Sequence, residues 1–132
     1  MPQVFPDFSE AMDFGPGPED IYEGRIINVD METAETGTPY IAVRYTLYGE
    51  RAVLNKVDKR QLTRNYMLKG KGSGFLKRFL AAAKVADGVF RDTDQLIGRL
   101  VMVATTNETY EGEVQMRVKT VMPHPAQAPL TA

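Results

Sequence analysis

The sequence predicts an all-β protein with a single helix, and three observations lead to this prediction. Apolar and polar residues alternate with the period of a β-strand at 40–48 and 112–122. Two further segments, 22–29 and 99–106, are short, apolar and rich in β-prone residues. Apolar residues recur at helical spacing over 75–88. With 132 residues, 43% of them hydrophobic, the chain suits one compact domain.

The first two strands are expected to be joined by a short turn. Regular structure should begin at Ile21, and residues 22–29 (YEGRIINV) should form the first strand. Residues 36–39 (TGTP) are typical of a turn. In the strand that follows, the core-facing side chains should be Ile41, Val43, Tyr45 and Leu47. The opposite face should present Tyr40, Ala42, Arg44, Thr46 and Tyr48, and Gly49 should end the strand.

The middle of the chain contains an ambiguous region followed by the helix. Residues 50–69 are compatible with a strand or an extended loop, because a charged stretch separates their two strand-like fragments. The helix should begin with Ser73 as its N-cap and should stop at Gly88. Its core-facing residues should be Phe75, Leu76, Phe79, Leu80 and Ala83, with Lys77, Arg78, Ala81 and Lys84 on the other side.

Two more strands complete the pattern. Gly98 introduces the strand at 99–106, and Glu111-Gly112 marks a hairpin turn before the strand at 112–122. In this last strand Val114, Met116, Val118 and Thr120 should oppose Gln115, Arg117, Lys119 and Val121. A five-stranded Greek-key barrel with its helix between strands three and four, the OB-fold, has this order of elements. The helix face of Phe75, Leu76, Phe79 and Leu80 should close the bottom of that barrel and take no part in ligand binding.

The distribution of charge is uneven although the net charge is only −1. Between Arg51 and Arg78 there are nine Lys or Arg residues and one acid, Asp58. Residues 1–37 show the reverse, with nine Asp or Glu and one base, Arg25. If the basic residues share one face of the molecule, their field attracts phosphate groups. The basic segment is therefore the first place to look for function.

Several kinds of chemistry are not expected. The segment GKGSG at 70–74 lacks the spacing of a phosphate-binding P-loop, although Lys71 and the preceding Lys69 can still contact a phosphate. The only histidine, His124, lies between two prolines without a neighbouring carboxylate, so it should be inert. There is no cysteine, and the acidic residues lack the paired spacing of a two-metal nuclease. The sequence therefore predicts no enzyme, no cofactor and no metal site.

Single-stranded nucleic acid is the ligand that this pattern favours. Cations that follow a phosphate backbone, together with aromatic rings on which bases stack, are what sequence-independent binding requires. The predicted binding residues are Tyr40, Arg44, Tyr48, Arg51, Lys56, Lys59, Arg60, Arg64, Tyr66, Lys69, Lys71, Lys77, Arg117 and Lys119. One alternative is a small interaction or virion accessory module whose basic loop binds an acidic protein. Another is binding to double-stranded DNA.

The chain also resembles phage-encoded single-stranded-DNA-binding proteins of the OB-fold type over about residues 8–122. The resemblance lies in the order of DFSEAMDF, YEGRIINV, YIAVRYTLYG, the basic segment, GFLKRFLAAAKVADG and QLIGRLVMV. It implies a five-stranded barrel that coats transient single strands during phage replication or recombination. Bacterial proteins of this function typically end in an acidic tip, whereas this chain ends in HPAQAPLTA. The acidic N-terminal segment is therefore expected to substitute for that tip, competing for the groove or docking a partner.

Three parts of the chain are expected. Residues 1–20 should form an acidic, aromatic arm, residues 21–122 the single-strand-binding domain, and residues 123–132 a disordered tail. Neither a signal peptide nor a membrane span is expected, so the cytoplasm is the predicted compartment, which is that of the host cell if the chain is phage-encoded as the resemblance implies. The expected partner is single-stranded DNA. RNA, phage or host replication or recombination proteins, and a second copy of the chain remain open as further partners.

Overall fold

The structure, a computed structural model, describes residues 17–70, 73–86 and 89–130. Its strands are β1 (Ile21–Thr33), β2 (Pro39–Tyr48), β3 (Gln61–Met67), β4 (Leu100–Tyr110) and β5 (Glu113–Pro123). Its helices are α2 (Glu50–Leu54), α3 (Ser73–Ala82) and the short 3-10 helix η1 (Thr93–Leu96). The predicted all-β class is confirmed.

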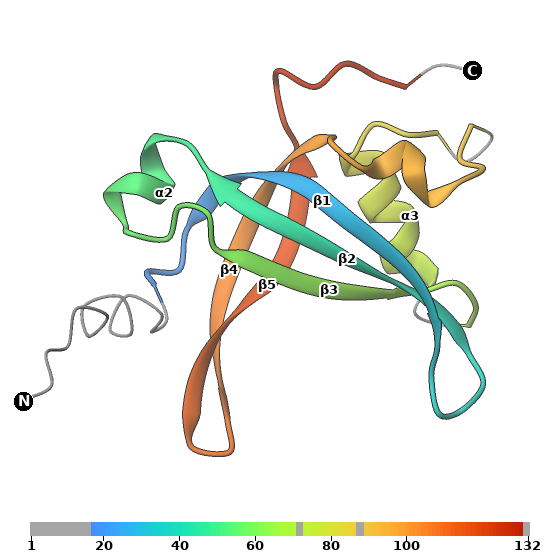
Figure 1. Ribbon diagram of the computed structural model, residues 1–132, viewed down its shortest axis with the longest axis horizontal. Helices are drawn as coiled ribbons and strands as arrows, with labels where there is room; N and C mark the ends of the chain where they lie inside the picture. The colour runs from blue at the N-terminus through green and yellow to red at the C-terminus, as the bar shows by residue number, and fades with distance from the viewer. Residues whose placement is uncertain (1–16, 71–72, 87–88, 131–132) are drawn as a thin grey trace, which may run out of the picture.

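The five strands form one antiparallel sheet in the order β3-β2-β1-β4-β5. The β4–β5 hairpin runs steeply across the layer formed by β1, β2 and β3, and α2 and α3 lie at opposite ends of that layer (Figure 1). The two edge strands, β3 and β5, are not paired through their backbones in the described part of the chain. Backbone pairing therefore does not close the sheet into the predicted barrel.

The seam between β3 and β5 is instead bridged by one side chain. Arg64 on β3 donates hydrogen bonds through Nη1 to the carbonyl oxygens of Val118, at 2.8 Å, and Lys119, at 2.9 Å. A guanidinium group has five donors, so it can satisfy two carbonyl groups that an open strand edge would otherwise leave to water. A side chain thus links the two edge strands at one point, where a backbone ladder was expected.

The core follows the predicted alternation of β2. Ile41, Val43, Tyr45 and Leu47 are fully buried, as expected for one face of a strand. They pack with buried side chains from each of the four remaining strands, namely Tyr22, Ile26, Val29, Leu62, Tyr66, Val101, Val103, Met116 and Val118. Helix α3 adds Phe79 and Leu80 to this cluster. The core thus lies between the curved sheet and α3.

Two β-bulges interrupt the strands. Where β1 pairs with β2, the partners pass from Ile26–Tyr45 to Asn28–Arg44, so Ile27 is the extra residue. Where β4 pairs with β5, they pass from Ala104–Thr120 to Thr105–Val118, so Lys119 is the extra residue. Lys119 and Thr120 are consequently both exposed, and the next residue, Val121, packs against the core. The prediction that Val121 faces outward is wrong because the bulge reverses the alternation.

The ambiguous region at 50–69 contains a one-turn helix and a strand. Helix α2 ends at Leu54, and the chain turns through Lys56 and Lys59, which have φ of 60° and 65°, before β3 begins at Gln61. The expected third strand is therefore present, but it occupies only the last part of this region.

The helix prediction is confirmed for its inner face, with one exception. Phe79, Leu80 and Ala83 are buried, whereas Phe75 keeps 49% of its surface exposed. Helix α3 includes Ser73 as its first residue and ends at Ala82; Lys84, with φ of 60°, follows in a turn. The predicted stop, Gly88, lies outside the described residues.

Both predicted turns between paired strands are present. The backbone of Ala34 donates to Thr38 at 2.9 Å and closes the turn between β1 and β2. Glu111 and Gly112 join β4 to β5 with φ of 50° and 82°. A two-residue hairpin with both central residues at positive φ is a favoured connection, and it explains the Glu-Gly pair.

Residues 124–130, which we call the C-terminal strap, lie against the body of the molecule. Lys84 Nζ donates to the carbonyl oxygens of His124, at 3.1 Å, and Gln127, at 2.6 Å, and Leu130 forms a bridge with Val85. Gln127 Oε1 in turn accepts from the backbone of Leu100 at 2.7 Å. The expected disorder of 123–132 is corrected for this part, because side-chain and backbone contacts hold it against the body although it has no regular structure of its own.

Candidate nucleic-acid interface

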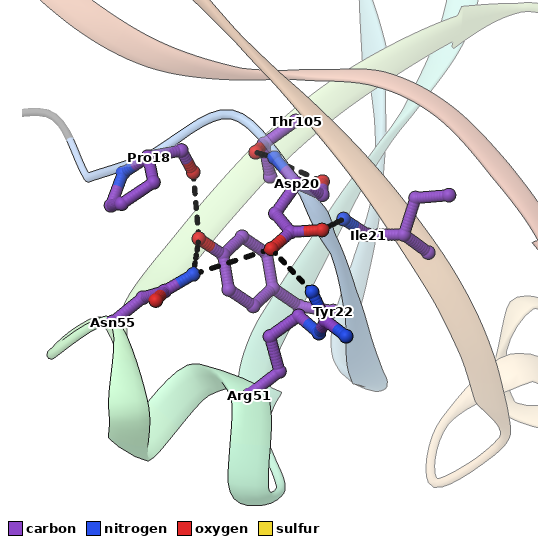
Figure 2. A network of polar contacts seen from close by, with 7 residues as sticks. All are labelled: Pro18, Asp20, Ile21, Tyr22, Arg51, Asn55 and Thr105. Carbon is purple, nitrogen blue, oxygen red and sulfur yellow. Dashed lines mark hydrogen bonds and ion pairs between the residues drawn. The ribbon is translucent and has the colours of Figure 1, made fainter.

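The N-terminal segment 17–20 is anchored through Asp20. Its carboxylate accepts from Arg51 Nη1 at 2.9 Å and from the backbone N–H of Ile21 at 2.8 Å (Figure 2). Its backbone carbonyl accepts from the N–H of Thr105 at 2.9 Å, so the segment is held to both α2 and β4. Arg51, predicted to contact DNA, is therefore paired with an acid of the N-terminal arm. The remainder of that arm, residues 1–16, lies outside the described residues.

The same network includes a buried tyrosine. Tyr22 Oη donates to the carbonyl of Pro18 at 2.6 Å and accepts from Asn55 Nδ2 at 2.9 Å (Figure 2). Asn55 follows directly after α2, so these bonds fix α2 against the start of β1. The cluster in Figure 2 joins three elements and leaves Arg51 less available to an external phosphate.

Hydrogen bonds and opposite charge keep the two acids of this segment ionised. The Arg51 guanidinium, followed by the Ile21 amide, lowers the pKa of Asp20 from its ordinary value. The backbone amide of Asn107, followed by the Thr106 hydroxyl, lowers the pKa of Glu19. Both carboxylates therefore stabilise the docked segment at neutral pH.

A groove of about 410 Å³ lies between β3 and the β4–β5 hairpin. Two arginines and two neutral polar side chains face it, accompanied by one acid. Its lining is Thr63, Arg64, Asn65, Glu108, Arg117 and Val118. The positive charge at this site thus comes from two strands that are far apart in the sequence.

A second hollow, of about 770 Å³, lies beside α2. It is lined by Glu23, Gly49, Glu50, Arg51 and Leu54. Its two carboxylates face a single guanidinium, which is already paired with Asp20. A phosphate would be repelled there, so the smaller groove is the better candidate for a polyanion.

The outer face of β2 presents two of its three predicted contact residues to solvent. Arg44 is exposed and Tyr40 is half-buried, and Tyr40 Oη donates to Glu32 at 3.4 Å. On β3, Thr63 pairs with Arg44 and Asn65 with Ala42, so these polar groups share that face. The face is therefore continuous from β2 to the strand that lines the groove.

Tyr48 is covered by the C-terminal strap. The ring of His124 lies nearly parallel to that of Tyr48, with centroids 6.4 Å apart, and His124 Nε2 lies 3.3 Å from the tyrosine hydroxyl. The same nitrogen lies 2.8 Å from a carboxylate oxygen of Glu23. Partial burial, and secondly the Glu23 charge, raise the pKa of Tyr48. The expectation that His124 lacks a nearby carboxylate is wrong, because the fold brings it to Glu23, which is distant in the sequence.

Tyr66 does not offer a surface to bases. It is 3% exposed, its hydroxyl lies 2.9 Å from that of Tyr45, and its ring stacks on Phe79 at 4.6 Å. Burial is the main cause of its raised pKa. Its pairing with Ile41 places it on the core face of β3, and this corrects the prediction of a stacking platform.

The remaining predicted cations do not gather on one face. Lys56 and Lys59 are exposed in the turn after α2, Lys69 follows β3, and Lys77 lies on the solvent side of α3. Lys71 lies outside the described residues. Among the others, Arg60 is half-buried and Lys119 is exposed at the bulge. The nearly pure basic segment is thus divided among the two ends and one edge of the sheet.

The sequence prediction did not include two aromatic residues that the structure shows to be exposed. Tyr110 is 59% exposed beside the hairpin turn, on the face of β4 that also carries Glu108. Phe75 is exposed at the beginning of α3, although its spacing predicted a core residue. The position of Tyr110 directly before Glu111-Gly112 was a usable signal, because side chains near a hairpin turn are rarely buried.

Comparison with known proteins adds no relative. No protein-family model matches this sequence, and no curated protein matches it. Over the ranges that the structure describes, no helix has the length and apolar character needed to cross a membrane. Within those same ranges, no group of three or more His, Asp or Glu side chains is arranged to hold a metal ion.

Proposed function

We propose that this chain binds single-stranded DNA with little sequence preference and belongs to the OB-fold class. The OB-fold is a partly open five-stranded Greek-key barrel whose β2–β3 face and β4–β5 loop bind oligonucleotides. The strand order β3-β2-β1-β4-β5, with α3 between β3 and β4, supports this class. The side-chain bridge from Arg64 to β5 agrees with a barrel that is only partly open.

The groove between β3 and the β4–β5 hairpin is the observation that carries the proposal. Arg117 lies on its wall, Arg44 lies on the adjoining β2 face, and Lys119 is exposed on β5. These cations attract the phosphate groups of a nucleic acid whatever its base sequence. The half-buried Tyr40 on β2 and the exposed Tyr110 beside the β4–β5 turn supply aromatic rings near this path, and every base has a face that can stack on them.

The charges predict a moderate, salt-sensitive affinity. If Arg44, Arg117 and Lys119 each neutralise one phosphate, the logarithm of the binding constant should fall with the logarithm of salt with a slope of about −2. The carboxylate of Glu108 in the groove repels phosphate, so the affinity for DNA should be lower than the cations alone would give. Binding of this kind suits a protein that coats and protects single strands without selecting them. Phage replication or recombination is the setting that we propose, on the resemblance described above.

Fluorescence anisotropy with labelled oligo-dT and a matched duplex, at low and high salt, tests the proposal. We expect oligo-dT to bind more tightly than the duplex, and Arg117→Gln to weaken binding and flatten the salt dependence. Arg91→Gln is the matched control, because Arg91 is an exposed arginine that does not line the groove. Equal affinity for the duplex would refute single-strand preference. If no oligonucleotide binds at low salt, a protein-interaction module becomes the better interpretation.

A further inference from the structure

The arrangement around Phe75 is not explained by packing of the core. Phe79 and Leu80 fill the buried side of α3, whereas Phe75 is 49% exposed. Two guanidinium groups lie close to its ring. The Cζ atoms of Arg64 and Arg78 are 5.5 Å and 5.4 Å from the ring centroid. Both distances are within the range of cation–π contact.

A single exposed aromatic residue is common on protein surfaces and would carry no conclusion by itself. Here, however, the ring is linked to the groove through Arg64. The guanidinium of Arg64 contacts the Phe75 ring and also bonds the carbonyls of Val118 and Lys119 in the seam. Phe75 therefore continues the surface that begins in the groove, past the seam and onto α3.

The charges beside Phe75 suit an anionic ligand. Arg78 and Lys77 are both exposed on α3. Among the residues that the structure describes, no carboxylate forms an ion pair with either of them. An aromatic ring flanked by unpaired cations offers a base a surface for stacking and offers the adjoining phosphate a positive partner.

We propose that Phe75 and Arg78 form a second stacking subsite for single-stranded DNA, so that the strand leaves the groove over Arg64 and crosses the first turns of α3. This subsite rests on the proposed function and extends it to a helix that was expected to touch no DNA. A base stacks on the Phe75 ring or on the Arg78 guanidinium plane, and Lys77 neutralises a neighbouring phosphate. The subsite makes no base-specific contact and is tolerant of sequence.

The chain contains no tryptophan, so Phe75→Trp places a single fluorescent indole at the subsite. Stacking of a base on this indole quenches its fluorescence. Leu54→Trp is the matched control, because Leu54 is 79% exposed on α2, at the opposite end of the β1–β2–β3 layer from α3 (Figure 1). Binding is followed independently by the anisotropy of labelled oligo-dT. Circular dichroism melts of each variant establish that it is folded.

We expect oligo-dT to quench Phe75→Trp at the concentrations that raise anisotropy, and to leave Leu54→Trp nearly unchanged. Phe75→Leu keeps an apolar side chain without a π-system and should weaken binding roughly tenfold, the loss of one stacked base. Binding without quenching at Phe75→Trp, or equal quenching of both tryptophans, would overturn the subsite and leave the proposed function standing. Unchanged affinity in Phe75→Leu would overturn it as well. Absence of any anisotropy change would overturn the proposed function, and the subsite with it.

Discussion

Replacing Arg64 by methionine tests whether one side chain closes the sheet. The change keeps an unbranched apolar stem that can lie against Phe75 and Tyr66, but it removes both hydrogen bonds across the seam. A hydrogen bond to a charged group contributes about 1.5–3 kcal/mol. Arg64 is half-buried, and water can replace part of each bond, so each of the two bonds should contribute about 1 kcal/mol, below that range.

We therefore expect Arg64→Met to reduce the free energy of unfolding by about 2 kcal/mol. For a chain of this length, that loss lowers the thermal midpoint by roughly 6–8 °C. Urea and thermal unfolding, followed by circular dichroism, measure the two quantities. The control is Arg44→Met, because Arg44 is exposed on β2, and its replacement should change the free energy by less than about 0.5 kcal/mol. Equal stability of the two variants would refute the role of Arg64 as a bridge.

Three further predictions concern the ends of the chain and the core. Because the pKa of Asp20 is lowered, its pair with Arg51 stabilises the fold at pH values above the ordinary aspartate pKa of about 4. This contribution is lost as the pH falls through the lowered pKa of Asp20. The thermal midpoint should therefore fall less between neutral and acid pH in Asp20→Asn than in the unaltered chain. A Cβ at buried Gly24 would lie 2.5 Å from a methyl group of Val103, so Gly24→Ala should cost about 1–3 kcal/mol in urea unfolding, and a neutral result would contradict the close approach of β1 and β4. Lys84→Met removes two hydrogen bonds to the C-terminal strap, so proteolysis should cleave the strap faster while the sheet stays intact; unchanged cleavage would show that the strap is held by other contacts.

The strands were predictable where their pattern was strictly local. The alternation of Ile41, Val43, Tyr45 and Leu47 needs only a two-residue period, and the Glu111-Gly112 turn needs only positive φ. The bulge at Lys119 was not predictable, because it depends on how β5 pairs with β4.

The candidate site was less predictable because it depends on pairing and distant contacts. Tyr66 and Arg64 are two residues apart, and the register of β3 against β2 places both on the core side, opposite Ile41 and Val43. Tyr66 is buried there against Phe79, whereas Arg64 is half-buried at the seam with β5, and no local pattern indicates that difference. His124 contacts Glu23, 101 positions away, and nothing in its proline-flanked neighbourhood indicates that contact. The basic segment is continuous in sequence, but the turn after α2 and the start of α3 carry its members to different surfaces.

The buried pair Tyr45 and Tyr66 gives the molecule an optical signal of its own. Burial raises the pKa of both phenols, so the folded chain keeps them neutral at alkaline pH where an unfolded chain would ionise them. Stability is therefore lost as the pH rises above the ordinary tyrosine value of about 10. Because these two rings join β2 to β3 and both contact Phe79 of α3, their ionisation accompanies the separation of the helix from the sheet. In a chain without tryptophan, the share of the late tyrosinate absorbance that comes from these two rings, apart from that of Tyr48 under the strap, records that separation.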